Sequence, residues 1–269
     1  MTLVIALKVG DGVVLGADSA STISAGNSYI NSYFNAEKLF NLPKGYPVGA
    51  LTFGLGGLQS RSIGSLAKDL RARFLDTSSS SWHLPRDSYT VEQIADGVRR
   101  FFYDELYEPQ FAGQPDAPSM GFFVAGYSAG SSSAEVWRVS LSSGNCDVEQ
   151  TIGTDAGWDM TWEGVGESMF RLVRGWSSAT HERLVQAGMP PEDAVKLLDA
   201  VQPLVHPTMP IQDAIDLVHY LMDVAIGFVR FSPGAAVVAP PIDSAAITRH
   251  EGFRWVRRKH YFSPEFNRA

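Results

Sequence analysis

The sequence predicts an α+β fold in which two antiparallel sheets stack face to face and helices cover both outer faces. Strands and helices are expected in blocks: hairpins, two amphipathic helices, more strands, further helices and final strands, unlike the alternation of a βαβ fold. Residues 13–17 and 48–53 are continuously apolar, as in strands buried on both faces. With 269 residues and 45% hydrophobic content, the chain is expected to form one domain, 1–269.

The chain is expected to open with a β-hairpin. Apolar runs at 3–9 and 13–17 flank Gly10-Asp11-Gly12, and a Gly/Asp turn between β-branched runs favours a hairpin. Residues 20–35 are rich in Ser, Asn and Gly, which predicts a loop with short extended pieces. This loop is expected to lead into a strand that holds Lys38.

Two helices are expected in the next part of the chain. The strand at 48–53 ends in Gly54-Leu55-Gly56-Gly57, and apolar residues recur at helical spacing over 58–75. A helix is therefore predicted to begin just past these glycines. The second helix is predicted to start at Thr90-Val91-Glu92-Gln93, which has the form of a capping box, and its apolar stripe continues to Leu106.

The second half of the chain is expected to contain strands, helices and then strands again. Strands are predicted at 120–127, 134–141, 146–152, 158–164, 235–238, 244–247 and 253–256. Helices are predicted at 167–176, 179–188, 190–204 and 210–228. The last helix has the clearest apolar face of the set.

Thr2 is the candidate nucleophile. Because Thr2 is small, we expect an aminopeptidase to remove Met1, which leaves a threonine with both a hydroxyl and a free α-amine. Such an amine, with a pKa near ~7.7–8, is partly unprotonated at neutral pH and can take the hydroxyl proton. A nearby cation would lower the pKa of this amine, and Lys38 is the candidate cation. A buried cation calls for a counter-ion, and Asp18 is the candidate.

Three features occur together: the run from Thr2 to Lys8, the run from Asp11 to Ser19, and Lys38 before an apolar segment. Together they resemble the N-terminal third of proteasome β-type subunits, which are N-terminal-nucleophile (Ntn) hydrolases. The resemblance is closest over residues 2–60. The segments 230–234 and 240–243 are similar to Anbu-type bacterial proteasome homologues.

The resemblance implies a four-layer αββα fold and amide hydrolysis through an acyl ester on Thr2. Lys38 would lower the pKa of the α-amine, Asp18 would be its partner, and the N–H of Gly54 would bind the oxyanion. Backbone N–H groups of a glycine-rich turn after a strand suit a developing negative charge. The substrate would be a peptide or protein. The resemblance also implies a specificity pocket near Ser21, Ala36 and Thr52.

The sequence departs from the family pattern at two places. Val165 stands where the family has the serine of a Gly-Ser-Gly turn, and Val229 stands where it has the aspartate of an Asp-x-x-Ser pair, which leaves only Ser232. Ser168 is a candidate substitute for the missing serine, and Asp243 is a further candidate if its strand passes the site. These departures leave open a proteasome-like scaffold or binding subunit without turnover. Assembly with other copies into a homo-oligomeric ring or spiral is expected by resemblance.

A serine hydrolase is the third alternative, because Gly126-Tyr127-Ser128-Ala129-Gly130 fits G-x-S-x-G. A nucleophile elbow needs a helix directly after the serine. Residues 131–139 alternate like a strand, so a hairpin turn is the favoured interpretation. A Ser–Asp–His order would combine Ser128 with Asp213 or Asp243 and with His219 or His250.

Composition argues against several classes of protein. A net charge of −7 disfavours general affinity for nucleic acid or anionic membranes, and the basic cluster 254–259 is expected to be a solvated strand end or a subunit contact. Cys146 is the single cysteine, which excludes an internal disulfide and favours a reducing compartment. No apolar run approaches ~20 residues, so a cytoplasmic protein is expected. The six histidines show no close pair at ligand spacing, so neither a metal nor a cofactor is expected.

Overall fold

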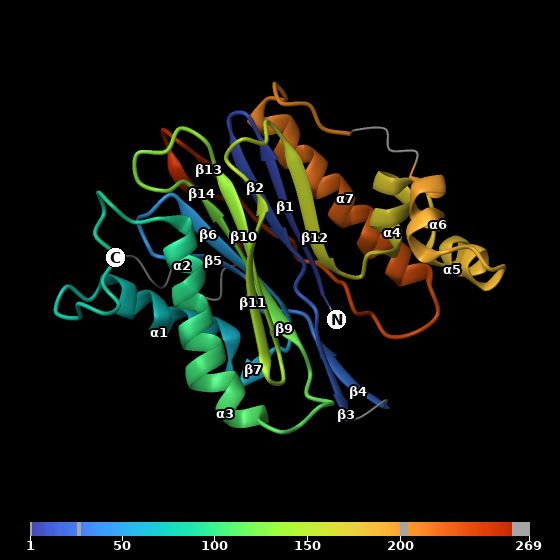
Figure 1. Ribbon diagram of the computed structural model, residues 1–269, viewed down its shortest axis with the longest axis horizontal. Helices are drawn as coiled ribbons and strands as arrows, with labels where there is room; N and C mark the ends of the chain where they lie inside the picture. The colour runs from blue at the N-terminus through green and yellow to red at the C-terminus, as the bar shows by residue number, and fades with distance from the viewer. Residues whose placement is uncertain (1, 26–27, 200–203, 260–269) are drawn as a thin grey trace, which may run out of the picture.

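Two five-stranded antiparallel sheets form the centre of the protein (Figure 1). The computed structural model describes residues 2–25, 28–199 and 204–259. Sheet I has the order β12-β1-β2-β13-β14, with bounds Asp159–Gly164, Leu3–Val9, Gly12–Ala17, Asp243–Thr248 and Gly252–Arg257. Sheet II has the order β11-β10-β9-β6-β5, with bounds Asn145–Ile152, Glu135–Ser142, Met120–Gly126, Val48–Gly54 and Leu39–Asn41.

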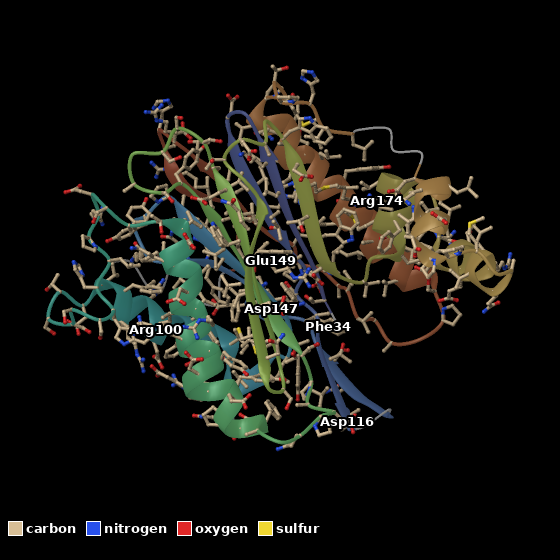
Figure 2. The ribbon with its side chains drawn as sticks, in the orientation of Figure 1. Phe34, Arg100, Asp116, Asp147, Glu149 and Arg174 are labelled. Atoms are coloured by element: carbon tan, nitrogen blue, oxygen red, sulfur yellow. The ribbon has the colours of Figure 1, made fainter. Side chains whose placement is uncertain are left out.

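Helices cover the outer faces of both sheets (Figure 1). On sheet II lie α1 (Ile63–Leu75), α2 (Val91–Val98), a π-helical continuation (Arg99–Tyr107) and α3 (Glu108–Phe111). On the side of sheet I lie α4 (Glu167–Met169), a short π-helical segment (Phe170–Arg174), α5 (Ser178–Gln186), α6 (Pro191–Leu198) and α7 (Ile211–Phe231). Figure 2 shows Arg100 and Arg174 on these two opposite helical sides. The architecture is therefore the four-layer αββα sandwich that the sequence predicts.

Three apolar cores separate the four layers. Strand β1 illustrates how the sequence builds them: Leu3, Ile5 and Leu7 pack toward α7, whereas Val4 and Ala6 face sheet II. Because side chains alternate across a strand, a strand buried on both faces is apolar along most of its length, and Lys8 is the exception in β1. A third core fills the space between sheet II and its helices.

Local signals explain where helices α1 and α2 begin. Helix α2 has the predicted capping box, in which Thr90 Oγ1 accepts from Gln93 N at 3.0 Å and Gln93 Oε1 accepts from Thr90 N at 3.0 Å. Helix α1 begins at Ile63, later than predicted, because residues 57–62 form the small hairpin of β7 (Gly57–Leu58) and β8 (Arg61–Ser62). Ser62 is the N-cap of α1, with its hydroxyl accepting from Ser65 N at 3.2 Å.

Two further segments differ from the prediction. The polar segment after β2 forms a hairpin of its own, β3 (Ser21–Ala25) and β4 (Ser28–Tyr33). The predicted strand at 235–238 is wrong: this segment belongs to neither sheet, although Val237 and Val238 are buried under α7. Its apolar side chains fill a core, so apolar content alone misidentified it. The predicted helix end at 200–203 lies outside the described residues.

Strand register places the candidate site at one end of sheet I. Leu3 lies opposite Gly164 of β12, and Val4 lies opposite Ala17 of β2. Ala17 is also opposite Asp243 of β13. Four strand ends therefore meet at the same end of sheet I: the start of β1, the end of β2, the end of β12 and the start of β13.

Candidate active site

The structure brings the three predicted residues Thr2, Asp18 and Lys38 into direct contact. Thr2 Oγ1 donates to Asp18 Oδ1 at 2.8 Å, and Lys38 Nζ donates to the same oxygen at 2.6 Å. Lys38 Nζ also donates to Thr2 Oγ1. Thr2 is 3% exposed, Asp18 0% and Lys38 7%, so these charges and the hydroxyl are shielded from bulk water.

Asp18 is the centre of this group, because its carboxylate accepts hydrogen bonds from the side chains of Thr2 and Lys38 and from three backbone N–H groups. Besides the two side chains, it accepts from Leu3 N at 3.0 Å, Ala20 N at 2.8 Å and Ala239 N at 3.2 Å. A fully buried carboxylate is tolerated only when hydrogen bonds and a cation compensate for lost hydration. These donors fix the carboxylate, and through it the hydroxyl of Thr2.

Lys38 lies directly before β5 rather than inside a strand. Its carbonyl oxygen nevertheless accepts from Thr52 N at 2.9 Å, which anchors it to β6. Burial lowers the pKa of the Lys38 ammonium, and attraction to Asp18 opposes that effect. The lysine is therefore a cation that gives up its proton more readily than an exposed lysine.

A recess opens beside Thr2, and the remaining predicted positions of the resemblance line it. Its walls include the candidate oxyanion donor Gly54 together with Ser21, Ala36 and Thr52. Gly54 adopts φ +83, and a Cβ there would lie 2.4 Å from Ser119 O. Only glycine fits this backbone conformation without displacement. The side chains in this wall are small, which leaves space in front of Thr2.

The segment after β12 covers the start of β1. Val165 N donates to Thr2 O at 2.8 Å, while the Val165 side chain packs against the core under α7. Ser168, at the start of α4, is buried, and its hydroxyl has no hydrogen-bond partner among the described residues. Ser168 is thus a free buried hydroxyl close in sequence to a segment that touches Thr2.

Ser232 does not line the recess. Its hydroxyl donates to Phe228 O at 2.7 Å, at the end of α7. Val229 is buried in the core under α7. The segment that the resemblance matched to the family's Asp-x-x-Ser pair therefore serves to end a helix.

Ser128 has structural partners. Its hydroxyl donates to Glu135 Oε1 at 2.6 Å and accepts from Val91 N at 2.9 Å, so it links β10 to the start of α2. A turn and then a strand follow it, as the hairpin interpretation predicts. His219 is buried and its Nε2 contacts Ser244 Oγ at 2.8 Å. No described hydrogen bond joins Ser128 to an aspartate or histidine of the proposed triads.

Sequence reasoning missed two buried lysines. Lys259, from the basic cluster expected to be solvated, is only 6% exposed in its side chain and pairs with Asp243. Lys8 is 2% exposed and donates to Gly153 O at 2.7 Å. Lys8 lies inside the apolar run 3–9, which is a local signal for its burial. Lys259 has no such signal, because the residues that bury it come from distant parts of the chain.

Metal binding, membrane spanning and a reactive thiol can each be compared with the described part of the chain. Within residues 2–25, 28–199 and 204–259, no group of three or more His, Cys, Asp and Glu side chains is placed to hold a metal ion. No helix in these ranges has the length and apolar character needed to span a bilayer. Burial raises the pKa of the Cys146 thiol to about 11, which disfavours the reactive thiolate.

Comparison with known proteins identifies the fold. No protein-family model and no curated protein matches the sequence. Solved structures similar to this chain include an Anbu (Gly-1) mutant from Hyphomicrobium sp. strain MC1, with 14% sequence identity and a TM-score of 0.54. The match covers 96% of this chain and 86% of the Anbu chain. The chain therefore has the proteasome-like Ntn-hydrolase fold, as the resemblance implies.

Proposed function

We propose that the protein is an N-terminal threonine hydrolase that cleaves amide bonds of peptides through an acyl ester on Thr2. The observation that carries this proposal is the contact of one hydroxyl, Thr2 Oγ1, with a buried carboxylate and a buried ammonium at the wall of an open recess. The fold supports it, because the chain has the fold of an Anbu structure and the start of β1, next to Thr2, lies at the end of sheet I where β12 ends.

The first half of the reaction requires removal of Met1, which frees the α-amine of Thr2. The neutral amine takes the proton of Oγ1, and the oxygen forms a bond to the substrate carbonyl carbon. The carbonyl oxygen becomes an oxyanion that the N–H of Gly54 would stabilise. The C–N bond then breaks, and the protonated amine gives its proton to the leaving nitrogen, which leaves an ester on Thr2.

In the second half, water takes the place of the leaving amine. The α-amine removes a proton from the water, the hydroxide oxygen attacks the ester carbon, and the ester bond breaks. The proton returns to Thr2 Oγ1 and the carboxylic acid departs. The amine must therefore be unprotonated before each half-reaction.

Lys38 and Asp18 would set that protonation state. The Lys38 ammonium contacts Thr2 Oγ1, so a second positive charge on the adjacent amine is disfavoured and the pKa of the amine falls. Asp18 keeps the ammonium in place at 2.6 Å. The unpartnered hydroxyl of Ser168 is the candidate to bind the amine or its water, in place of the serine replaced by Val165.

Substrate selection would lie with the recess. Ser21, Ala36 and Thr52 are small, so a sizeable apolar side chain next to the scissile bond is the expected substrate feature. We also propose self-association into a homo-oligomeric ring or spiral, supported by exposed apolar side chains on the sheet I side: Leu197 is 66% exposed and Phe231 is 83% exposed. Light scattering of the purified protein tests the assembly.

Two measurements test the proposed hydrolase. Intact-mass analysis should give the mass of a chain lacking Met1, and fluorogenic peptides should be cleaved by this protein but not by Thr2→Ala. Retention of Met1 in protein that still cleaves peptides would overturn the assignment of Thr2. Labelling of Ser128 by a fluorophosphonate, with activity kept in Thr2→Ala, would establish the serine-hydrolase alternative.

A scaffold or binding subunit without turnover is the second candidate. It is favoured by the loss of polar support: the Val165 side chain is part of an apolar core, and the Ser232 hydroxyl is engaged at the end of α7. This candidate expects a chain that has lost Met1 yet neither cleaves peptides nor reacts with a threonine-directed inhibitor. Covalent labelling of Thr2 by a β-lactone would exclude it.

A further inference from the structure

A second buried ion pair lies beside the candidate site. Lys259, two residues after β14, forms an ion pair with Asp243, the first residue of β13, and the two side chains are 6% and 4% exposed. The backbone N–H of Lys259 also donates to Asp243 Oδ1 at 2.9 Å. Strand β13 hydrogen-bonds to β2, which ends one residue before Asp18.

Ser19 connects this pair to the nucleophile group. Lys259 Nζ donates to Ser19 Oγ at 2.7 Å, and Ser19 Oγ donates to Pro241 O. Ser19 N donates to Ala239 O at 2.9 Å, while Ala239 N donates to Asp18 Oδ2 at 3.2 Å. The segment 239–243 is therefore fastened at both ends, to Asp18 and to Lys259.

The charges in this part of the protein balance before any proton is added to Thr2. Two ammonium groups, Lys38 and Lys259, face two carboxylates, Asp18 and Asp243. A protonated amine on Thr2 would be an additional, uncompensated buried charge, which is strongly disfavoured. The positive charge of Lys259 also lowers the pKa of Lys38, in the same direction as the larger effect of burial.

Other titratable groups face this region from every neighbouring element. Glu37 lines the recess and pairs with Lys68 of α1 at 3.2 Å. His219 of α7 contacts Ser244, next to Asp243, and burial lowers its pKa. Arg257 of β14, opposite Ser244, is exposed; its charge also lowers the pKa of His219, whereas Asp216 and Asp223 of α7 raise it. Glu37 is compensated by its own partner and His219 favours the neutral form, so the two ion pairs are the buried charges described in this region.

We propose that Lys259 is a positioning residue of the candidate active site: its buried ammonium holds Ser19 and the segment 239–243 against Asp18, and it supplies a second fixed positive charge beside the Asp18–Lys38 pair. This inference rests on the proposed function for its catalytic consequence. Its electrostatic part concerns Lys38 alone and is measurable without turnover.

The titration of Lys38 tests the electrostatic part. The chain has six lysines, so side-chain-labelled lysine gives few NMR signals, and Lys38→Arg identifies the signal of Lys38. In Lys259→Met the pKa of Lys38 should rise by about one pH unit, because a nearby positive charge is removed. Lys259→Arg and Lys196→Met, on exposed α6, should leave it unchanged. Equal Lys38 titration in the natural protein and Lys259→Met would overturn the proposal.

The pH dependence of kcat/KM tests the catalytic part. The rise of kcat/KM on the low-pH side of the profile should move to higher pH in Lys259→Met and stay in place in Lys259→Arg. If Lys259 were only structural, its loss would lower stability without moving this rise. If Lys259→Met does not fold, Lys259→Gln keeps donors to Ser19 and Asp243 but removes the charge, and the same shift is expected. An unmoved rise in the neutral, folded variant would overturn the positioning role.

The two hypotheses fail in different ways. If the natural protein cleaves no peptide and binds no threonine-directed inhibitor, the proposed hydrolase fails. The NMR titration then still decides whether Lys259 controls Lys38. If the enzyme is active and Lys38 titrates alike with and without the charge at position 259, only the inference about Lys259 fails.

Discussion

The two ends of the interior between the sheets each bury a lysine, yet they differ in what surrounds it. Lys8 and Lys38 are 2% and 7% exposed, and burial lowers the pKa of both. Lys38 contacts a carboxylate and the Thr2 hydroxyl and lines an open recess. Lys8 donates to a carbonyl oxygen and to Ser133 Oγ at 3.1 Å.

This difference shows that a buried lysine with a lowered pKa is not by itself a sign of catalysis. Asp155, Glu135 and Asp159 stabilise the charge of Lys8 without touching it, and its hydrogen bonds join β1 to loops of the opposite sheet. At the Lys38 end the same cost of burying a charge is combined with the candidate nucleophile Thr2 and an open recess. Access and a reacting partner, together with the perturbed pKa, distinguish the candidate site.

The largest effect is expected from replacing Lys38 with methionine, and the same replacement at Lys8 is the control. Lys38→Met should reduce peptide cleavage by about 100-fold or more, because it removes the charge that poises the amine. It also leaves Asp18 buried without a cation, which is expected to destabilise the fold by about 3–5 kcal/mol. Lys8→Met should leave kcat/KM within about twofold, as measured on fluorogenic peptides at a temperature where both variants are folded. A loss in Lys8→Met as large as in Lys38→Met would remove the distinction between the two ends.

Two glycines with positive φ provide the next contrast. Gly54 has φ +83 and no space for a Cβ, whereas Gly130 has φ +75 in a loop at the Lys8 end with nothing within 4 Å. Gly130→Ala should destabilise by about 1 kcal/mol, the cost of a left-handed conformation. Gly54→Ala should destabilise by roughly 3 kcal/mol and displace the candidate oxyanion donor, with a drop in kcat. Denaturant unfolding and steady-state kinetics measure both; equal effects would argue against the tight backbone at Gly54.

A smaller effect is expected for the two candidate serines. Ser168→Ala should lower kcat/KM by about tenfold, the value of one hydrogen bond to a reacting group. It should leave stability unchanged, because the hydroxyl has no described partner to lose. Ser232→Ala should change kcat/KM by less than about twofold, since its hydroxyl binds Phe228 O. Full activity in Ser168→Ala would remove Ser168 from the mechanism.

The smallest effect is the change of folding stability with pH that the buried Lys8 causes. Its folded-state pKa lies below the ordinary value of 10.5, so the unfolded chain binds more protons between the two values. Stability should therefore rise with pH through that window, because the burial penalty is full below the folded-state pKa and disappears above 10.5. Urea unfolding of the natural protein and Lys8→Met between pH 7 and about 10.5 should show a steeper rise of stability with pH in the natural protein, and the difference isolates Lys8 because Lys38 contributes to both curves. Parallel curves would contradict the lowered pKa.

The sequence predicts the architecture well where periodicity is strong. The hairpin of β1 and β2, the capping box at Thr90 and the long helix α7 all follow from local patterns. The segment 235–238 was misassigned because apolar side chains can fill a core without joining a sheet. The start of α1 was misplaced because the short hairpin before it has no apolar period.

The candidate site was partly accessible to sequence reasoning. The order of Thr2, Asp18 and Lys38 between apolar strands predicts them as a group, and the structure brings them within hydrogen-bonding distance. No local pattern predicts the burial of Lys259, because it depends on Ser19, just past β2, and on Asp243 of β13, which are distant in sequence. Long-range contacts of this kind leave no periodic trace around the residue itself.

The most direct test of the account is the reaction of the purified protein with a peptide epoxyketone, followed by peptide mapping. This reagent can close a ring only by bonding to both a hydroxyl and a free amine of one residue. We predict one adduct per chain, attached to Oγ1 and N of Thr2 and absent from Thr2→Ala. Protein that keeps Met1 and forms no adduct, or that is labelled only through a single bond at an internal hydroxyl such as Ser128, would contradict the account.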